Sequence, residues 1–235
     1  MFWLNISMRA SELFEANVAP DPDFMDELSY GVDDALEEYQ EYLDSHDDLD
    51  NINHLEDLLN SSVDEELRVD FTTNYNPTES DWWMSAEATT GLTDDGERVT
   101  DINVILNARN LIGSYGPKTF KKHLMRLMSH ELVHKGQHSR IPDMDKMASG
   151  YTKAAGAKNH RDWERTYLRD PHELMAYGET LAQEIRDTEN PDAVIRNPDA
   201  FMQELPTYAR FRNIFPKDTP QIKALLKYTY RYLKA

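Results

Sequence analysis

The 235-residue chain contains no cysteine, so its fold has no disulfide bonds, and a bound metal ion must be held by histidine and carboxylate side chains. This composition is typical of an intracellular protein. The sequence also lacks an apolar run long enough to cross a membrane, and its first four apolar residues are too few for the hydrophobic region of a signal peptide. We therefore expect neither membrane association nor secretion.

Basic residues are scarce in the first half of the chain. Residues 1–117 contain 28 acidic and 4 basic side chains, whereas residues 118–235 contain 15 acidic and 21 basic ones. The net charges are thus −24 and +6. Such an acidic surface commonly aids solubility, and it disfavours direct nucleic-acid binding by the whole protein. The basic and tyrosine-rich residues 223–234 can stack on bases, but a terminal helix with packed tyrosines is the simpler interpretation.

The front of the chain is predicted to be separate from the main domain. Residues 1–31 are expected to form a poorly ordered arm, because a Pro-Asp-Pro-Asp stretch interrupts any regular element there. Apolar spacing then predicts helices at 31–46 and 52–59. We accordingly assign residues 1–62 to an acidic N-terminal arm with helices, and residues 63–235 to the main domain.

After residue 62 the apolar pattern changes to alternation, which predicts strands at 67–71, 82–90 and 99–107, with turns at 74–80 and 94–96. The polar residues 136–170 are long for a structureless loop, so they either form a functional lid or contain a short helix. Later helices are predicted at 171–186, 191–204, 207–214 and 220–233. The expected fold class is therefore α+β, a small antiparallel sheet followed by a helical C-terminal part.

One pentapeptide predicts chemistry. His130-Glu131-Leu132-Val133-His134 reads H-E-x-x-H within a predicted helix at 118–135. Residues four apart share one helix face, so both imidazoles can bind one metal ion, and Glu131 can reach a water on that ion. The alternative is a solvated helix face. Apolar residues at helical spacing argue for a buried helix instead, in which two histidines need partners that a metal supplies.

A catalytic zinc site usually has a third protein ligand. Glu173 is the best candidate, because it opens a new predicted helix 39 residues after His134. Asp170 and Pro171 give Glu173 a competing structural role, as the third residue of a capping box that closes the start of that helix. Other possible ligands are His160, Glu164 and His172.

The motif helix followed by Asp170-Pro171-x-Glu173-x-x-Ala176-Tyr177 resembles uncharacterised, phage-encoded proteins of the gluzincin type, a group of zincin-like zinc metallopeptidases. The resemblance covers about residues 101–184. It implies that zinc is bound by the two motif histidines and Glu173. A phage origin would place the protein in the host cytoplasm or in the virion.

The resemblance also implies a zincin-like architecture. In that fold the last strand before the motif helix is an exposed sheet edge, which pairs with an extended substrate by strand addition. We expect residues 101–108 to occupy this position. The alternative is that this strand lies inside the sheet and pairs only with its neighbours.

The expected reaction is peptide-bond hydrolysis by a zinc metalloendopeptidase. Zinc lowers the pKa of a bound water toward about 7, and Glu131 takes its proton and delivers it to the leaving amine. Tyr177, one turn after Glu173, is a possible donor to the oxyanion, although core packing is the commoner role for such a residue. Tyr151 and Tyr167 compete for the donor role.

Two other functions stay open. The chain can be a virion component or interaction protein that keeps a zincin fold without turnover. It can also be a regulated enzyme whose acidic N-terminal arm covers the cleft. The expected partners are a protein or peptide substrate and, for a phage protein, other virion proteins.

Overall fold

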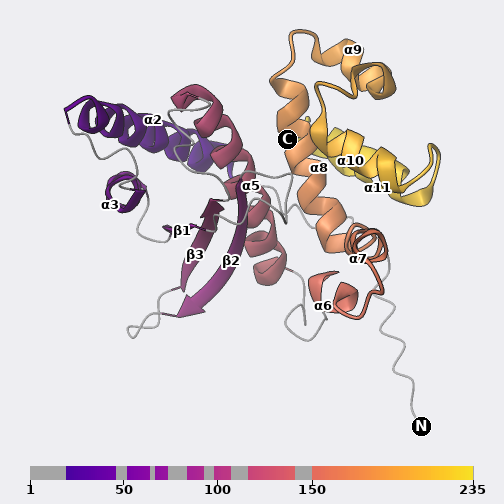
Figure 1. Cartoon of the computed structure of the whole chain (residues 1–235). Coiled ribbons are helices and arrows are strands. Elements are labelled where there is room, and N and C mark those ends of the chain that lie inside the picture. The colour runs from indigo at the N-terminus through magenta and orange to yellow at the C-terminus, as the bar shows by residue number, and fades with distance from the viewer. Residues whose placement is uncertain are drawn as a thin grey trace. The chain divides into compact units, whose positions relative to one another are not determined.

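The computed structural model describes residues 20–45, 52–63, 67–73, 84–92, 98–106, 116–140 and 150–234 (Figure 1). These residues are mostly helical, with one small sheet, which confirms the α+β class. They divide into two compact units, residues 20–135 and 136–234, which are treated separately below. None of the helices in these ranges combines the length and apolar character that crossing a bilayer requires.

The first unit consists of α2 (Pro22–Ser45), α3 (Ile52–Ser62), β1 (Leu67–Thr73), β2 (Met84–Leu92), β3 (Arg98–Leu106) and most of α5 (Pro117–Arg140). Apolar side chains from all six elements share one core. Both acidic helices are therefore part of the same core as the sheet, and the predicted boundary after residue 62 separates elements that pack together.

Helix α2 begins nine residues earlier than predicted. The Asp21 carboxylate accepts a hydrogen bond from the Asp23 backbone N–H at 3.0 Å, and Pro22 takes the first helical position. Backbone N–H groups in the first turn of a helix have no partner within that helix. Proline, which has no N–H, therefore loses no hydrogen bond at this position and is favoured there. The stretch that was read as a breaker is thus a helix start, which corrects the prediction for residues 22–31. The remainder of the predicted arm, residues 1–19, lies outside the described residues.

The sheet is mixed, in the order β1-β3-β2. Strand β3 pairs in parallel with β1 and antiparallel with β2. The prediction of an antiparallel sheet is therefore wrong for β1. Alternating apolar residues indicate strands but not which strands are neighbours. Ile102 and Val104 are fully buried, as expected for a central strand. The predicted turns at 74–80 and 94–96 lie outside the described ranges.

The central position of β3 also overturns the prediction of a substrate-binding edge at residues 101–108. Residues 101–106 are paired on both sides, with β1 and with β2, so their backbone donors and acceptors are occupied. The alternative interpretation, a strand that pairs only with its neighbours, is confirmed for these residues. Residues 107 and 108 lie outside the described ranges.

Helix α5 extends the predicted helix to Arg140. Phe120, Leu124, Met128 and Leu132 recur every four residues and are buried in the core of the first unit. Lys121 fixes the start of the helix, because its Nζ donates to the Ser29 carbonyl oxygen at 3.0 Å. A helix with one buried stripe cannot rotate about its axis, so the core also sets the direction in which the motif side chains point.

The second unit contains the last turn of α5 and a series of later helices. The polar stretch 136–170 contains short helices, as the second of the two interpretations expects. Its described part holds the end of α5 and two helices, and residues 141–149 lie outside the description. The later helices are α6 (Gly150–Ala154), α7 (His160–Tyr167), α8 (Pro171–Arg186), α9 (Pro191–Arg196), the 3-10 helix η2 (Pro198–Phe201), α10 (Pro206–Ile214) and α11 (Pro220–Tyr232).

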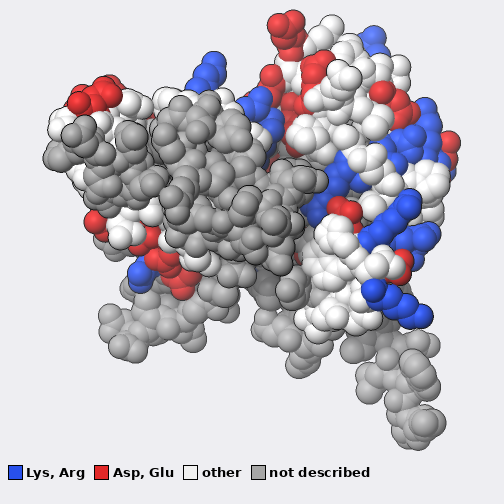
Figure 2. All heavy atoms as spheres, in the orientation of Figure 1, with Lys and Arg blue, Asp and Glu red and all other residues white. Residues whose placement is uncertain are grey.

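Helix α8 has the predicted bounds and runs beside α11, as Figure 1 shows. Gly178 permits this close packing, since a Cβ atom at that position would lie 2.5 Å from the Tyr228 Cβ. Tyr228 and Tyr232 are buried, which confirms for these two residues that the C-terminal tyrosines pack on the domain. On the face in Figure 2, Lys and Arg side chains of this unit are interspersed with acidic ones.

Candidate metal centre

Helix α5 presents the two motif histidines on one face, as the sequence predicts. The ring centroids of His130 and His134 lie 5.0 Å apart, with their planes at 76°. His130 and Glu131 are buried, at 7% and 8% exposure, and His134 is half-buried. A solvated helix face does not have this burial, so that alternative is excluded. Two imidazoles and a carboxylate held away from water require polar partners.

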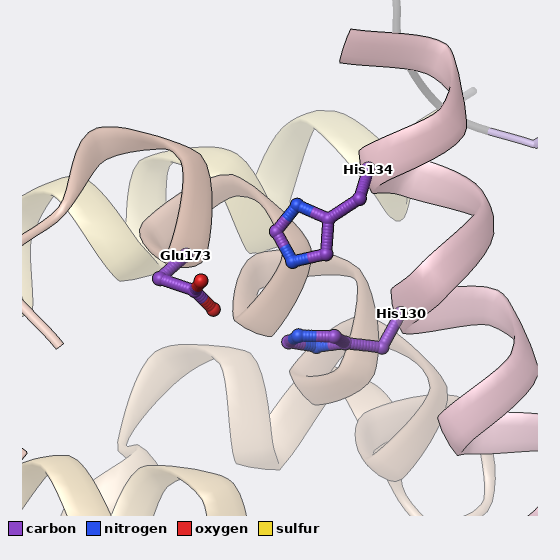
Figure 3. Close-up of side chains that lie close together, drawn as sticks. All are labelled: His130, His134 and Glu173. Atoms are coloured by element: carbon purple, nitrogen blue, oxygen red, sulfur yellow. The ribbon is translucent and has the colours of Figure 1, made fainter. Parts of the chain in front are cut away.

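A third side chain completes the cluster. Glu173 of α8 offers a carboxylate oxygen, and one ligand atom from each of His130, His134 and Glu173 lies within 4.8 Å of the other two. Figure 3 shows the two imidazoles extending from α5 and the carboxylate facing them from α8. The structure therefore brings together the three residues that the sequence proposes as ligands, and this group can hold a metal ion.

The start of α8 shows why the Glu173 carboxylate takes this direction. Asp170 is the N-cap, as predicted, and its carboxylate accepts a hydrogen bond from the His172 backbone N–H at 3.0 Å. A capping box would also require the Glu173 carboxylate to accept from the Asp170 N–H. That N–H instead donates to the Tyr167 carbonyl oxygen at 3.0 Å. The capping-box interpretation of Glu173 is therefore wrong.

Asp170 also anchors the elements around Glu173. Its fully buried carboxylate accepts from His172 Nδ1 at 3.0 Å and from Lys153 Nζ at 2.5 Å. Burial alone would raise the pKa of Asp170, but the hydrogen bonds from His172 and Lys153 outweigh it and hold the pKa below its ordinary value. The ionised carboxylate thus ties α6, which carries Lys153, to the first turn of α8.

Gln137 connects the two ligand-bearing helices. It lies three residues after His134 on α5 and is completely buried. Its side-chain Nε2 donates to the backbone carbonyl oxygen of His172, the residue before Glu173, at 2.9 Å. The bond fixes the last turn of α5, about one helical turn after His134, against the first turn of α8, where His172 directly precedes Glu173. Sequence analysis missed Gln137, although its spacing from His134 places both on one helix face.

The alternative ligands have other roles. His172 is hydrogen-bonded to Asp170, Glu164 pairs with Arg210 at 2.7 Å, and the exposed His160 stacks on Trp163 with centroids 6.1 Å apart. The metal-binding group includes none of the three alternatives. Among the acids and imidazoles of the described ranges outside α5, Glu173 is therefore the one that is grouped with the two histidines.

Tyr177, the predicted oxyanion donor, is half-buried in the second unit. Its hydroxyl accepts a hydrogen bond from Arg210 Nη1 at 2.6 Å, and its ring meets Phe211 edge to face with centroids 5.5 Å apart. The Tyr177 ring thus has a packing role, and a role of its hydroxyl as oxyanion donor remains a prediction. Arg210 follows Tyr177 by 33 residues, so no local pattern could have indicated the pair. The side chain of Tyr151 lies outside the description.

The donor set suits zinc. Two imidazole nitrogens and one carboxylate oxygen form a three-ligand set found in catalytic zinc sites, where each donor lies about 2.0–2.2 Å from the ion. Tetrahedral geometry then places donors roughly 3.4 Å apart, within the 4.8 Å limit of this cluster. The residues therefore fit a metal ion of this kind with small side-chain adjustments.

No protein-family model matches the chain, and neither a curated protein nor a solved structure shows similarity to it. The resemblance to phage gluzincins therefore rests on the motif residues alone.

Proposed function

We propose that this protein is a zinc-dependent metallopeptidase whose metal ion is held by His130, His134 and Glu173. The observation that carries the proposal is the convergence of these three donors from two helices. The spacing of the histidines follows from one helix face, but Glu173 is 39 residues away and competes with a helix-capping role. Its position beside the histidines is thus the feature that a chance occurrence of the motif would not explain.

The nitrogen-rich donor set favours zinc over the hard cations Mg²⁺ and Ca²⁺, which prefer oxygen ligands. A zinc ion held by these residues supplies a Lewis acid and lowers the pKa of a coordinated water. A zinc ion held by three protein ligands would keep room for that water, as catalytic zinc sites require.

Glu131 is the general base of the proposed reaction. It follows the ligand His130 directly on α5 and is itself buried. Its carboxylate takes a proton from the attacking water and then delivers that proton to the departing amine of the substrate. A purely structural zinc site has no need of this carboxylate, so Glu131 separates the catalytic function from a non-catalytic one.

The first experiment measures metal content by elemental mass spectrometry on the purified wild type and on two matched variants. Glu173→Gln removes the proposed ligand. Glu179→Gln alters another buried carboxylate of the same helix, which pairs with Arg186. We expect about one zinc per chain in the wild type and in Glu179→Gln, and little in Glu173→Gln. Equal zinc in both variants would exclude Glu173 as a ligand, and a zinc-free wild type after incubation with the ion would contradict the proposal.

The second experiment compares the wild type with Glu131→Gln on a peptide library. Loss of the general base should slow hydrolysis by about 10²- to 10⁴-fold while zinc content stays the same. Equal cleavage by both proteins would contradict the mechanism. Zinc binding without any cleavage by the wild type would favour a virion or interaction protein that keeps the site without turnover.

A further inference from the structure

His172, the residue directly before Glu173, is held by hydrogen bonds through three of its groups. Its backbone N–H donates to the Asp170 carboxylate at 3.0 Å, and its ring Nδ1 lies 3.0 Å from the same carboxylate oxygen. Its backbone carbonyl oxygen accepts from Gln137 Nε2 at 2.9 Å. That carbonyl belongs to the peptide group that joins His172 to Glu173. The backbone from which the proposed ligand extends is therefore fixed on both sides of His172.

Burial makes these hydrogen bonds specific. Gln137, the His172 ring and the Asp170 carboxylate are all buried. A buried polar group that loses its partner has no water to replace it, so each of these bonds is costly to break. The carbonyl oxygen of His172 has two lone pairs, of which the helix needs only one. It can therefore accept from Gln137 without disturbing the hydrogen bonding of α8.

The bonds from Asp170 and from Gln137 differ in what they connect. Asp170 is the N-cap of α8, so its bonds shape the first turn of that helix. Gln137 belongs instead to α5, three residues after the proposed ligand His134, and residues three apart share one helix face. Gln137 and His172 both lie in the second unit. The Gln137 bond thus joins the helix of the imidazoles to the peptide group that precedes the carboxylate.

We propose that Gln137 is a positioning residue, which sets the separation between the last turn of α5 and the first turn of α8 so that the Glu173 carboxylate meets the two imidazoles. This inference rests on the proposed function, because it concerns the same zinc ligand. Gln137 itself binds neither the metal ion nor the substrate.

The physical reason is that a glutamate side chain has several rotatable bonds, whereas a metal site needs its donors placed within about 0.5 Å. A bond to the peptide group beside Glu173 fixes the origin of that side chain, so fewer of its conformations have to be lost when it binds a metal. The alternative is that Gln137 only satisfies a buried carbonyl. In that case its loss lowers the stability of the zinc-free protein and leaves zinc affinity unchanged.

The test compares Gln137→Met with Gln183→Met. Methionine is unbranched and similar in length to glutamine, so it keeps the packing but removes the donor. Gln183 of α8 donates through Nε2 to Glu179 at 3.4 Å, and it lies about 15 Å along the helix from Glu173. The control therefore removes a glutamine donor of the same unit, far from the proposed ligand.

Three measurements are made on the wild type and both variants. Competition with a chelator gives zinc affinity, and the visible absorption spectrum of the cobalt-substituted protein reports the geometry of the ligands. Urea denaturation of the zinc-free protein gives stability separately. None of the three depends on activity.

We expect Gln137→Met to bind zinc about 10-fold more weakly and to change the cobalt spectrum, as loss of a group that orients a ligand does. Gln183→Met should match the wild type in both measurements. A Gln137→Met variant that is less stable without zinc but keeps the wild-type affinity and spectrum would overturn the positioning role and leave the proposed function intact. A wild type that binds no zinc would overturn both.

A second variant covers the case in which Gln137→Met does not fold. Gln137→Asn keeps a buried amide, but its side chain is one methylene shorter, so the amide no longer reaches the His172 carbonyl. We expect zinc affinity to fall by about 3- to 10-fold, with a cobalt spectrum that differs from the wild type. Wild-type affinity and spectrum in Gln137→Asn would show that the bond from Gln137 does not place the ligand.

Discussion

Among the described residues, buried acidic side chains are distributed unequally between the two units. Residues 20–135 bury one, Glu131, within the proposed site, and otherwise rely on a large apolar core. Residues 136–234 bury four, Asp170, Glu173, Glu179 and Glu184. Apolar packing thus holds the helix with the two histidines, whereas Glu173, the proposed carboxylate ligand, lies in a unit that holds many of its buried groups by hydrogen bonds.

The partners of these acids explain the difference. Glu184 accepts from the Thr207 hydroxyl at 2.8 Å and from its backbone N–H at the start of α10. Asp170 has the same relation to α8. Buried carboxylates at helix starts satisfy N–H groups that have no partner inside the helix. Packing is sufficient to orient a helix, but a carboxylate must have specific donors, and these come from distant parts of the chain.

The largest effect expected from this comparison is on the apolar core. Phe120 is fully buried and lies with its ring centroid 6.5 Å from that of Phe71. Phe120→Ala should lower the free energy of unfolding by about 3–5 kcal/mol, because it removes a large apolar group and leaves a cavity. Urea denaturation measures the change. Tyr30→Ala, at a side chain that is 70% exposed, should stay within about 0.5 kcal/mol of the wild type. Similar losses in both variants would contradict a core at Phe120.

A smaller effect, on zinc affinity, is expected at Gly150, whose backbone packs against the side chains of Asp170 and Glu173. In Gly150→Ala the new Cβ would lie 3.0 Å from Glu173 Cγ and 3.0 Å from Asp170 Cβ, so the start of α8 must shift by a few tenths of an ångström. We expect zinc affinity to fall by up to about tenfold. Gly156→Ala is the matched control, because no atom lies within 4 Å of its added Cβ. Chelator competition on both variants measures the difference, and equal affinities would show that Gly150 is not needed for ligand placement.

The smallest effect concerns acid sensitivity. Asp199 accepts from Tyr208, Arg212 and Lys217, and hydrogen bonds, that from Lys217 foremost, lower its pKa to about 2. A lowered pKa gives stability that is complete above the ordinary Asp value of about 3.9 and is lost as pH falls toward 2. Asp199→Asn should therefore destabilise the protein at neutral pH.

The same variant should reduce the loss of stability between about pH 4 and pH 2, because the titrating group is gone. Urea denaturation at a series of pH values checks this. Asp192→Asn, at an exposed carboxylate of α9, serves as the control and should follow the wild type. A wild-type pH profile in Asp199→Asn would show that the cluster adds nothing to acid sensitivity.

Local patterns predicted much of the secondary structure. The start of α8 follows from Asp170 and Pro171, and the apolar spacing of α5 indicated a buried helix. Strand alternation located β1, β2 and β3 to within two residues at their starts, but not their order. The order of the strands in the sheet depends on which strand is buried on both of its faces. That burial is a property of the assembled core and not of a single strand. The start of α2 was missed because Pro22 was read as a breaker instead of a first helical residue.

For the candidate site, the sequence by itself determined the facing pair His130 and His134, because four residues make about one helical turn. The role of Glu173 was undetermined, since its position in the chain fits both a cap and a ligand. The tertiary structure excludes the cap, because the Asp170 N–H donates to the Tyr167 carbonyl oxygen, and it groups the Glu173 carboxylate with the two imidazoles. The bonds from Arg210 to Glu164 and Tyr177 were likewise invisible in the sequence, because they join three helices whose contacts exist only after the chain has folded.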